Sequence, residues 1–186
     1  MKKTLLLAAF VAILFTQCTK KQDAFAINNG QIGHVTNTTS MKQLDSIFAN
    51  DSIAPLNNVK DALGTQGEVE IFAKDGTKLL RLSPDDESNP NAVINTVRVY
   101  DARYKTDKGL SIKSTFKDLK DNYEISGTQT SIDAVVVFLK DSDIYITIDK
   151  KELPGNLRYN PSLKIEASQI PDTATFKYFM LAWDGE

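Results

Sequence analysis

The chain contains one cysteine and one histidine in 186 residues, and this scarcity excludes several classes of site. A single thiol cannot form a disulfide within the chain, so no cystine framework supports the fold. One histidine without spaced cysteines matches neither a structural zinc motif nor the two-histidine motif of zinc proteases. Serine and cysteine nucleophiles usually need a histidine base. We therefore predict no metal site, and we predict that His34 is an ordinary strand or loop residue.

Charge of one sign and phosphate-binding motifs are also missing. The chain has 22 basic and 24 acidic side chains, which are interspersed and give a net charge of −2. Nucleic-acid binding requires clustered lysine and arginine, so nucleic acid is not an expected partner. Neither a P-loop nor a G-x-G-x-x-G motif is present, and no cofactor is predicted.

Only one long apolar run exists, and it stands at the start: "MKKTLLLAAFVAILFTQC". Lys2 and Lys3 precede residues 4–16, which are mostly apolar. As a helix this run would reach about 20 Å, short of the ~30 Å hydrocarbon core of a bilayer. A basic start and a short apolar segment are typical of an export signal.

Cys18 ends this run, and residues 20–23 (KKQD) follow it closely. The segment resembles the signals of bacterial lipoproteins, in particular those of Bacteroidota. The resemblance implies a signal peptide at 1–17, acylation of Cys18, and anchoring to the outer membrane on its periplasmic or surface face. Charged residues after the cysteine are similar to tags that direct some of these proteins to the cell surface. The alternative is cleavage after the small-x-small sequence at 24–26, with Ile27 as the first mature residue.

Three blocks of sequence recur in the same order. The pairs are "SMKQLDSIF" at 40–48 with "TFKDLKDNY" at 115–123, "VEIFAKDGTKLLRL" at 69–82 with "VVVFLKDSDIYITI" at 135–148, and "NTVRVYD" at 95–101 with "YFMLAWD" at 178–184. The first pair has helical spacing, and the second predicts two strands about a tight turn, with Asp75-Gly76 as a two-residue hairpin signal. Short strands are expected before each helix, at 30–32 and 109–112.

The fold class that follows is α+β, with two tandem β-α-β-β-β repeats and a mainly antiparallel sheet. We place a linker at 18–28, the first repeat at 29–106 and the second at 108–186. Each half is small for a stable core of its own, so both are expected to share one core. A further short helix is expected at 57–63.

The sequence "STFK" gives Ser114 and Lys117 the spacing of the S-x-x-K nucleophile motif of penicillin-recognising enzymes. The repeat offers a simpler interpretation. It aligns Thr115 with Ser40, and each begins a capping box, with Asp118 and Gln43 three residues later. We predict a helix start here and no catalytic residue.

Other candidates remain open. The loop "SPDDESNPN" at 83–91 is acidic but lacks the ligand spacing of a calcium loop, and we expect a solvated hairpin loop.

Four aromatic residues form either a platform for glycan or peptide, or a cover for the core edge: Tyr100, Tyr104, Tyr159 and Trp183. The long links at 49–68 and 149–175 are the expected places for a contact surface.

The function predicted from these features is a lipid-anchored binding or assembly module of the cell envelope without catalytic activity. The membrane would be contacted through acyl chains on Cys18, and the partner would be an envelope protein or glycan. Two alternatives remain: a hydrolase inhibitor, and a hydrolase of envelope glycan with two carboxyl groups roughly 5 to 10 Å apart.

Overall fold

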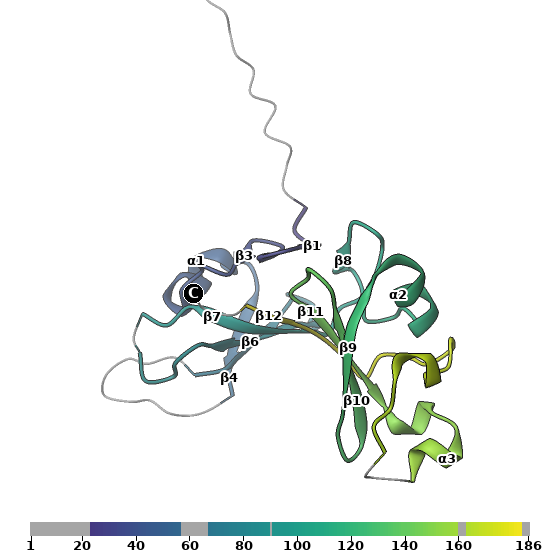
Figure 1. Ribbon diagram of the computed structural model, residues 1–186. Coiled ribbons are helices and arrows are strands. Elements are labelled where there is room, and N and C mark those ends of the chain that lie inside the picture. Colours follow the sequence, from purple (N-terminus) through teal and green to yellow (C-terminus); the bar gives the residue numbers. More distant parts are fainter. Residues whose placement is uncertain (1–22, 57–66, 90, 160–162, 184–186) are drawn as a thin grey trace, which may run out of the picture.

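The computed structural model describes residues 23–56, 67–89, 91–159 and 163–183. The predicted signal peptide at 1–17, Cys18 and the helix expected at 57–63 lie outside these segments. The fold is α+β, with mostly antiparallel sheets and few, short helices, as predicted (Figure 1). None of the helices in the described segments is long and apolar enough to cross a lipid bilayer.

A large sheet of eight strands forms the body of the molecule, in the order β4-β5-β6-β7-β12-β11-β10-β9. All of its neighbouring strands are antiparallel. The strands are β4 (Ser52–Pro55), β5 (Val69–Phe72), β6 (Lys78–Pro84), β7 (Ile94–Val99), β9 (Ile125–Thr130), β10 (Ala134–Leu139), β11 (Ile144–Asp149) and β12 (Tyr178–Ala182). The first four strands run inward from one edge and the last four from the other, and the two sets meet where β7 pairs with β12.

A small sheet of four short strands lies over the large one, in the order β3-β2-β1-β8. It comprises β1 (Ala26–Asn28), β2 (Gln31–Ile32), β3 (Val35–Thr36) and β8 (Lys105–Thr106). The pair β1–β8 is parallel and ties the start of the chain to its middle. The predicted linker at 18–28 therefore ends inside a strand.

The helices are α1 (Leu44–Ile47), α2 (Phe116–Asn122) and α3 (Gly155–Arg158), with 3-10 turns η1 (Met41–Gln43), η2 (Lys150–Glu152) and η3 (Ala167–Gln169). Both predicted helix starts are confirmed. The Ser40 N–H donates to Gln43 Oε1 at 2.8 Å, and the Thr115 N–H donates to Asp118 Oδ2 at 2.8 Å. These bonds satisfy backbone donors that a helix start would otherwise leave unpaired.

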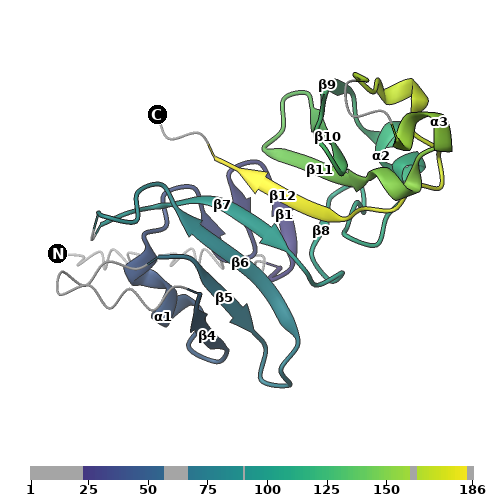
Figure 2. The same cartoon turned by 90° about the horizontal axis from the view of Figure 1, so that it is seen from below.

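Alternation along the strands gives the large sheet two different faces. Side chains such as Val97, Ile146 and Phe179 are fully buried under α1, α2 and the small sheet. The intervening side chains are mostly half-buried or exposed. Figure 2 looks onto this second side, which we call the open face, with strands β5 and β6 in front of α1. The core therefore lies on one side of the sheet only.

The predicted repeat unit needs correction at several points. Residues 109–112 form no strand, and each of the helices α1 and α2 is instead followed by an edge strand, β4 or β9, that was not predicted. The prediction of a tight two-residue turn at Asp75-Gly76 is also wrong. Gly76 has a positive φ of 83°, but Asp75 does not, and residues 73–77 connect the two strands.

The link at 149–175 is a packed cover and not a free loop. It contributes Leu153, Leu157, Ile165 and Ile170 to the core. Its backbone also bonds to β9, since Thr128 Oγ1 donates to the Ile165 carbonyl at 2.7 Å. These side chains close the core beside the β9–β10 pair at the edge of the large sheet.

Candidate functional site

Strand register places one row of side chains across the open face, from β5 to β10. Directly paired residues on neighbouring strands point to the same face of a sheet. The row, which we call the central row, is Glu70, Arg81, Arg98, Met180, Tyr145 and Phe138. It changes from charged at one end to aromatic at the other.

The charged end contains a buried carboxylate shared by two cations. Glu70 is 6% exposed, and its oxygens lie 2.7 Å from Lys78 Nζ and 2.7 Å from Arg81 Nη2. Burial opposes ionisation of Glu70, but the hydrogen bonds and positive charges of Lys78 and Arg81 outweigh it and lower the pKa of this carboxyl. Glu70 is thus held in its charged form.

Arg98 lies next in the row, and aromatic rings hold it. Its guanidinium carbon lies 3.7 Å from the ring centroid of Tyr178 and 4.8 Å from that of Tyr100. Lys78 Nζ approaches the same Tyr100 ring at 4.8 Å. Cation–π contacts of this kind fix a long side chain without using its N–H donors.

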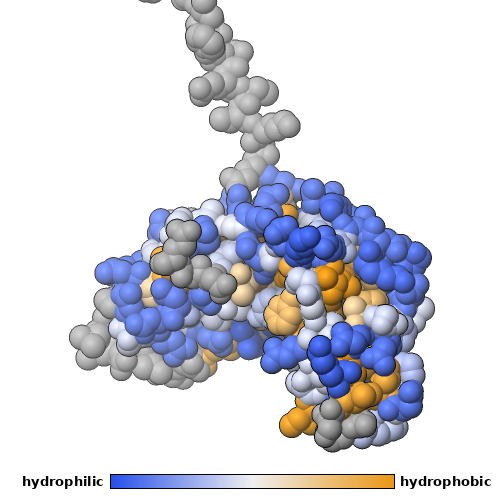
Figure 3. Space-filling view, viewed as in Figure 1, coloured by the Kyte–Doolittle hydropathy of each residue, from blue (hydrophilic) through white to orange (hydrophobic). Residues whose placement is uncertain are grey.

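The aromatic end is a stacked pair. The rings of Phe138 and Tyr145 have centroids 6.0 Å apart and an interplanar angle of 30°. Phe138 is 38% exposed, and burial raises the pKa of Tyr145. Figure 3, which shows the side of the molecule seen in Figure 1, has apolar side chains gathered over the region of β9–β11 within a polar surround.

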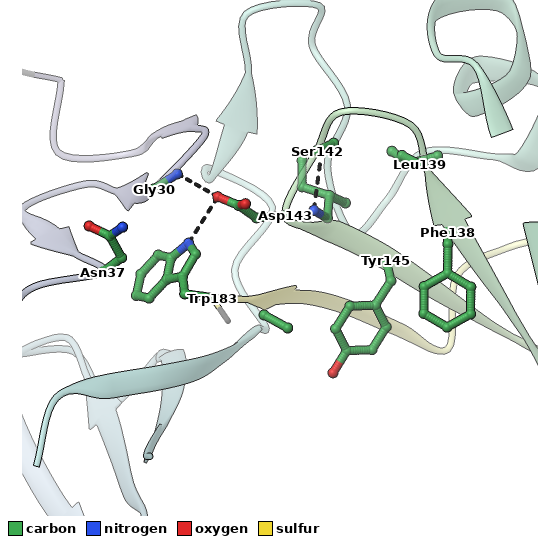
Figure 4. A pocket seen from close by; sticks show the side chains of 10 residues that line it. Gly30, Asn37, Phe138, Leu139, Ser142, Asp143, Tyr145 and Trp183 are labelled. Carbon is green, nitrogen blue, oxygen red and sulfur yellow. Dashed lines mark hydrogen bonds between the residues drawn. The ribbon is translucent and has the colours of Figure 1, made fainter. Parts of the chain in front are cut away.

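A cavity of about 590 Å³ adjoins this pair at the ends of β11 and β12 (Figure 4). Its wall contains Phe138 and Tyr145 on one side, and Asn37, Asp143 and Trp183 on the other. The Asn37 side chain contributes an amide group to this wall. The cavity combines flat apolar rings with polar groups, as ligand sites generally do.

Asp143 joins the two sheets at this cavity. Its Oδ2 accepts hydrogen bonds from the Trp183 indole Nε1–H, at 3.1 Å, and from the Gly30 backbone N–H. Gly30 precedes β2 in the small sheet, and Trp183 follows β12 in the large one. One carboxylate therefore connects the two sheets at the polar side of the cavity.

A second cavity, of about 380 Å³, lies on the other side of the β10–β11 turn. Asp107, Lys108, Lys140 and Asp141 all contribute to its lining. Lys140 is paired with Glu124 at 2.9 Å, and Lys108 donates to the Asn122 carbonyl at 2.7 Å. Among the residues whose placement is described, no three His, Cys, Asp or Glu side chains group as metal ligands.

The serine–lysine motif is a helix start, as predicted. Ser114 Oγ accepts from the Ser111 N–H at 3.1 Å, and Lys117 pairs with Asp121 one turn along α2. Lys117 is solvent-exposed. His34 is an exposed residue in the turn between β2 and β3, which confirms the prediction of a loop position.

The acidic loop between β6 and β7 is a solvated hairpin loop, as predicted. Asp86 Oδ1 accepts from the Ser88 N–H at 2.8 Å and from its hydroxyl at 2.6 Å. The Asp85 carboxylate accepts from the Val93 N–H at 3.0 Å. These carboxylates are used to shape the loop itself.

The prediction that four aromatic residues form a platform is wrong. Trp183 and Tyr104 are 4% and 3% exposed and cover the core edge, while Tyr159 is 80% exposed at the end of α3. Burial raises the pKa of Tyr104, whose ring packs edge-on against Phe25. Tyr100 alone of the four lies on the open face.

Sequence reasoning missed the residues that do gather there. Arg98 and Tyr145 were not singled out, although alternation along 94–99 and 144–149 would have placed both on the solvent side. Asp143, which precedes β11, was also missed. Local alternation does not show which strands become neighbours, because that depends on the distant pairing of β7 with β12.

Comparisons with known proteins give a fold and no function. No family model matches the chain, and no curated protein matches its sequence. Among solved structures the chain is similar to the uncharacterized protein YfeY from Escherichia coli, with a TM-score of 0.51 and 14% identity. The superposition covers 85% of this chain and 98% of that chain. At this identity the likeness shows that the two proteins share a fold, and nothing more.

Proposed function

We propose that this protein is a lipid-anchored binding or assembly module of the bacterial cell envelope, without catalytic activity. Acyl chains on Cys18 would hold it to the outer membrane, on the periplasmic or the surface face. It would bind an envelope protein or glycan through the central row and the adjoining cavity. The observation that carries the proposal is the composition of that row, since arginine, tyrosine, phenylalanine and methionine are enriched in the cores of protein interfaces.

The position of the chain start also supports this arrangement. β1 begins at Ala26 and lies in the small sheet, which covers the buried side of the large sheet. Residues 19–25 separate Cys18 from this strand, and at full extension they reach about 25 Å. An anchor at Cys18 would therefore hold the covered side toward the membrane and leave the open face turned away from it.

We also infer that the two halves, 29–106 and 108–186, arose from one duplicated unit. Each contributes four strands in chain order from its own edge toward the centre of the sheet. Equivalent backbone bonds support the idea. Met41 N–H donates to the Ala92 carbonyl at 3.0 Å, and Phe116 N–H donates to the Ala174 carbonyl at 2.9 Å. In each half the helix start is thus bound to the segment that leads into the central strand.

A carboxylate-based hydrolase is the alternative that the second cavity favours, because Asp107 and Asp141 both line it. A general acid in such an enzyme needs a raised pKa. In the described segments every carboxyl group whose pKa is shifted has it lowered: Glu70, Asp75, Asp86, Asp101, Asp118, Asp133 and Asp149. If the protein hydrolysed envelope glycan, and Asp107→Asn and Asp141→Asn each lost that activity, a catalytic function would replace the proposed binding function.

Photo-crosslinking in intact cells tests the proposal. A photoreactive phenylalanine would replace Phe138 in the full-length chain, and in a control it would replace Lys42, an exposed residue of η1 on the covered side. We expect one reproducible partner from position 138 and none from position 42. Equal capture at both positions, or none above an unrelated lipoprotein, would contradict it. A captured hydrolase would identify the protein as an inhibitor.

A further inference from the structure

We propose that Arg98 binds the carboxylate of an acidic side chain on a protein partner. This inference rests on the proposed function and specifies the chemistry of the partner. It concerns the middle of the central row, where β7 meets β12.

Among the residues that the structure describes, Arg98 differs from the other arginines in having no hydrogen-bond acceptor. Arg81 bonds to Glu70, Arg103 to Asp101 at 2.6 Å, and Arg158 to the Leu153 carbonyl at 3.0 Å. Within the described segments Arg98 makes only its two ring contacts. A guanidinium carries five N–H donors in a fixed fork, which matches a carboxylate in a bidentate geometry.

The stacking prepares this fork for a ligand. Tyr178 and Tyr100 both lie against the guanidinium, and Arg98 is half-buried in the open face. Ordering a long side chain on binding normally costs free energy, and a side chain already held by rings loses less of it. Charge-assisted bonds to such a group are among the strongest polar contacts in interfaces.

The local charge favours a single negative charge as the ligand. Lys78 and Arg81 share the carboxylate of Glu70, and Glu68 nearby accepts from the Ser83 hydroxyl at 2.6 Å. Lys177, beside Tyr178, is likewise paired with Asp133 and Asp149. Arg98 has no carboxylate partner among the described residues and so leaves one positive charge unpaired. One excess positive charge matches a carboxylate better than a doubly charged phosphate.

The neighbours of Arg98 favour a protein as the source of this carboxylate. Met180 lies directly beside it in the row, followed by the Tyr145–Phe138 pair. Such a surface suits apolar side chains on either side of an acidic one, and its residue types are those of protein interface cores. We therefore expect a segment in which aromatic or aliphatic residues flank Asp or Glu.

NMR titration of the mature chain in detergent would test the site, with the side-chain Nε–H signal of Arg98 as readout. The probe is the blocked peptide acetyl-Phe-Glu-Phe-amide, compared with its Gln counterpart and with glucuronate. We expect a saturable shift with the Glu peptide. The Gln peptide should bind at least about five-fold more weakly, because it loses one charge-assisted contact. Arg98→Lys, followed through the backbone amide signals of Met180 and Tyr145 beside it in the row, should weaken binding similarly. The matched control Arg103→Lys, at an arginine that stacks on Phe25 but already bonds to Asp101, should leave it unchanged.

Three results would overturn the inference. They are no saturable shift at Arg98, equal effects of the two arginine variants, and tighter binding of glucuronate, which would make the ligand a glycan. If crosslinking at position 138 captures a partner but the Arg98 signal does not shift with the Glu peptide, the inference fails and the proposed function stands. If position 138 captures no partner, the proposed function itself fails.

Discussion

At the scale of single residues, Asp143 shows how one side chain holds the candidate site together. It accepts from a backbone N–H of the small sheet and from the indole of Trp183 in the large sheet. Both donors lie at the wall of the cavity. Loss of this acceptor would leave them without a partner in a partly buried place, which is costly.

Asp143→Asn should therefore destabilise the protein by about 1–2 kcal/mol, because an amide cannot accept from both donors with the strength of a carboxylate. Urea unfolding followed by the fluorescence of Trp183, the single tryptophan, measures this. Asp141→Asn is the matched control. Asp141 has a positive φ of 51°, a conformation that asparagine also tolerates. Equal stability of the two variants would contradict the role given to Asp143.

The lowered pKa of Glu70 predicts that the free energy of unfolding depends on pH. Its folded-state pKa is lowered, so its stabilising contribution is complete above the unfolded pKa of about 4.3 and is lost as pH falls through the lower folded value. Glu70→Gln should be less stable than the parent at pH 7, and the difference should shrink as pH approaches 3. Unfolding free energies measured from pH 7 to 3 would show this. The exposed control Glu87→Gln should follow the parent at every pH, and a constant gap for Glu70→Gln would refute the assignment.

At the scale of elements, the start of α2 depends on Thr115. The Asp118 N–H donates to Thr115 Oγ1 at 3.4 Å, and Asp118 in turn accepts from the Thr115 N–H. Thr115→Ala should cost about 1 kcal/mol, whereas Thr115→Ser keeps the cap and should stay close to the parent. Chemical denaturation of both variants measures the difference. Equal loss in both would mean that the methyl group, not the hydroxyl, matters.

The elements that sequence predicts best are those fixed by local chemistry. The capping residues Ser40 and Thr115 locate both helix starts, and the blocks at 69–82 and 135–148 both form hairpins. The strands that were missed in the large sheet are its two edges. β4 contains Pro55 and β9 contains Gly127 among polar residues, and edge strands are commonly short, polar and interrupted in this way. Their sequences do not carry the signal of a strand that is buried on one face.

The candidate site is harder to predict than the elements, because it depends on pairing between distant segments. Arg98 and Tyr178 meet only because β7 pairs with β12, and Phe138 meets Tyr145 across a hairpin. Alternation in each strand indicates which side chains face outward. It does not indicate that an arginine will lie between two tyrosines, or that a cavity will open beside Asp143.

At the scale of the whole molecule, the two halves share one core. Buried residues of both, from Leu80 in β6 to Ile146 in β11, belong to a single cluster. Leu80→Ala and Ile146→Ala should each lower stability by about 2–5 kcal/mol and shift the same single unfolding transition. Calorimetry and circular dichroism check this. Separate transitions, each sensitive to only one of the variants, would show two independent domains.

The central claim is that the open face and its cavity bind an envelope partner while Cys18 anchors the opposite side. The most direct measurement is the amount of crosslinked partner captured in intact cells from position 138 relative to position 42. Mass spectrometry of the same captured chain would identify its first residue. The account predicts one reproducible partner from position 138 only, on a chain that begins at acylated Cys18. Equal yields from the two positions, or a chain that begins at Ile27, would contradict it.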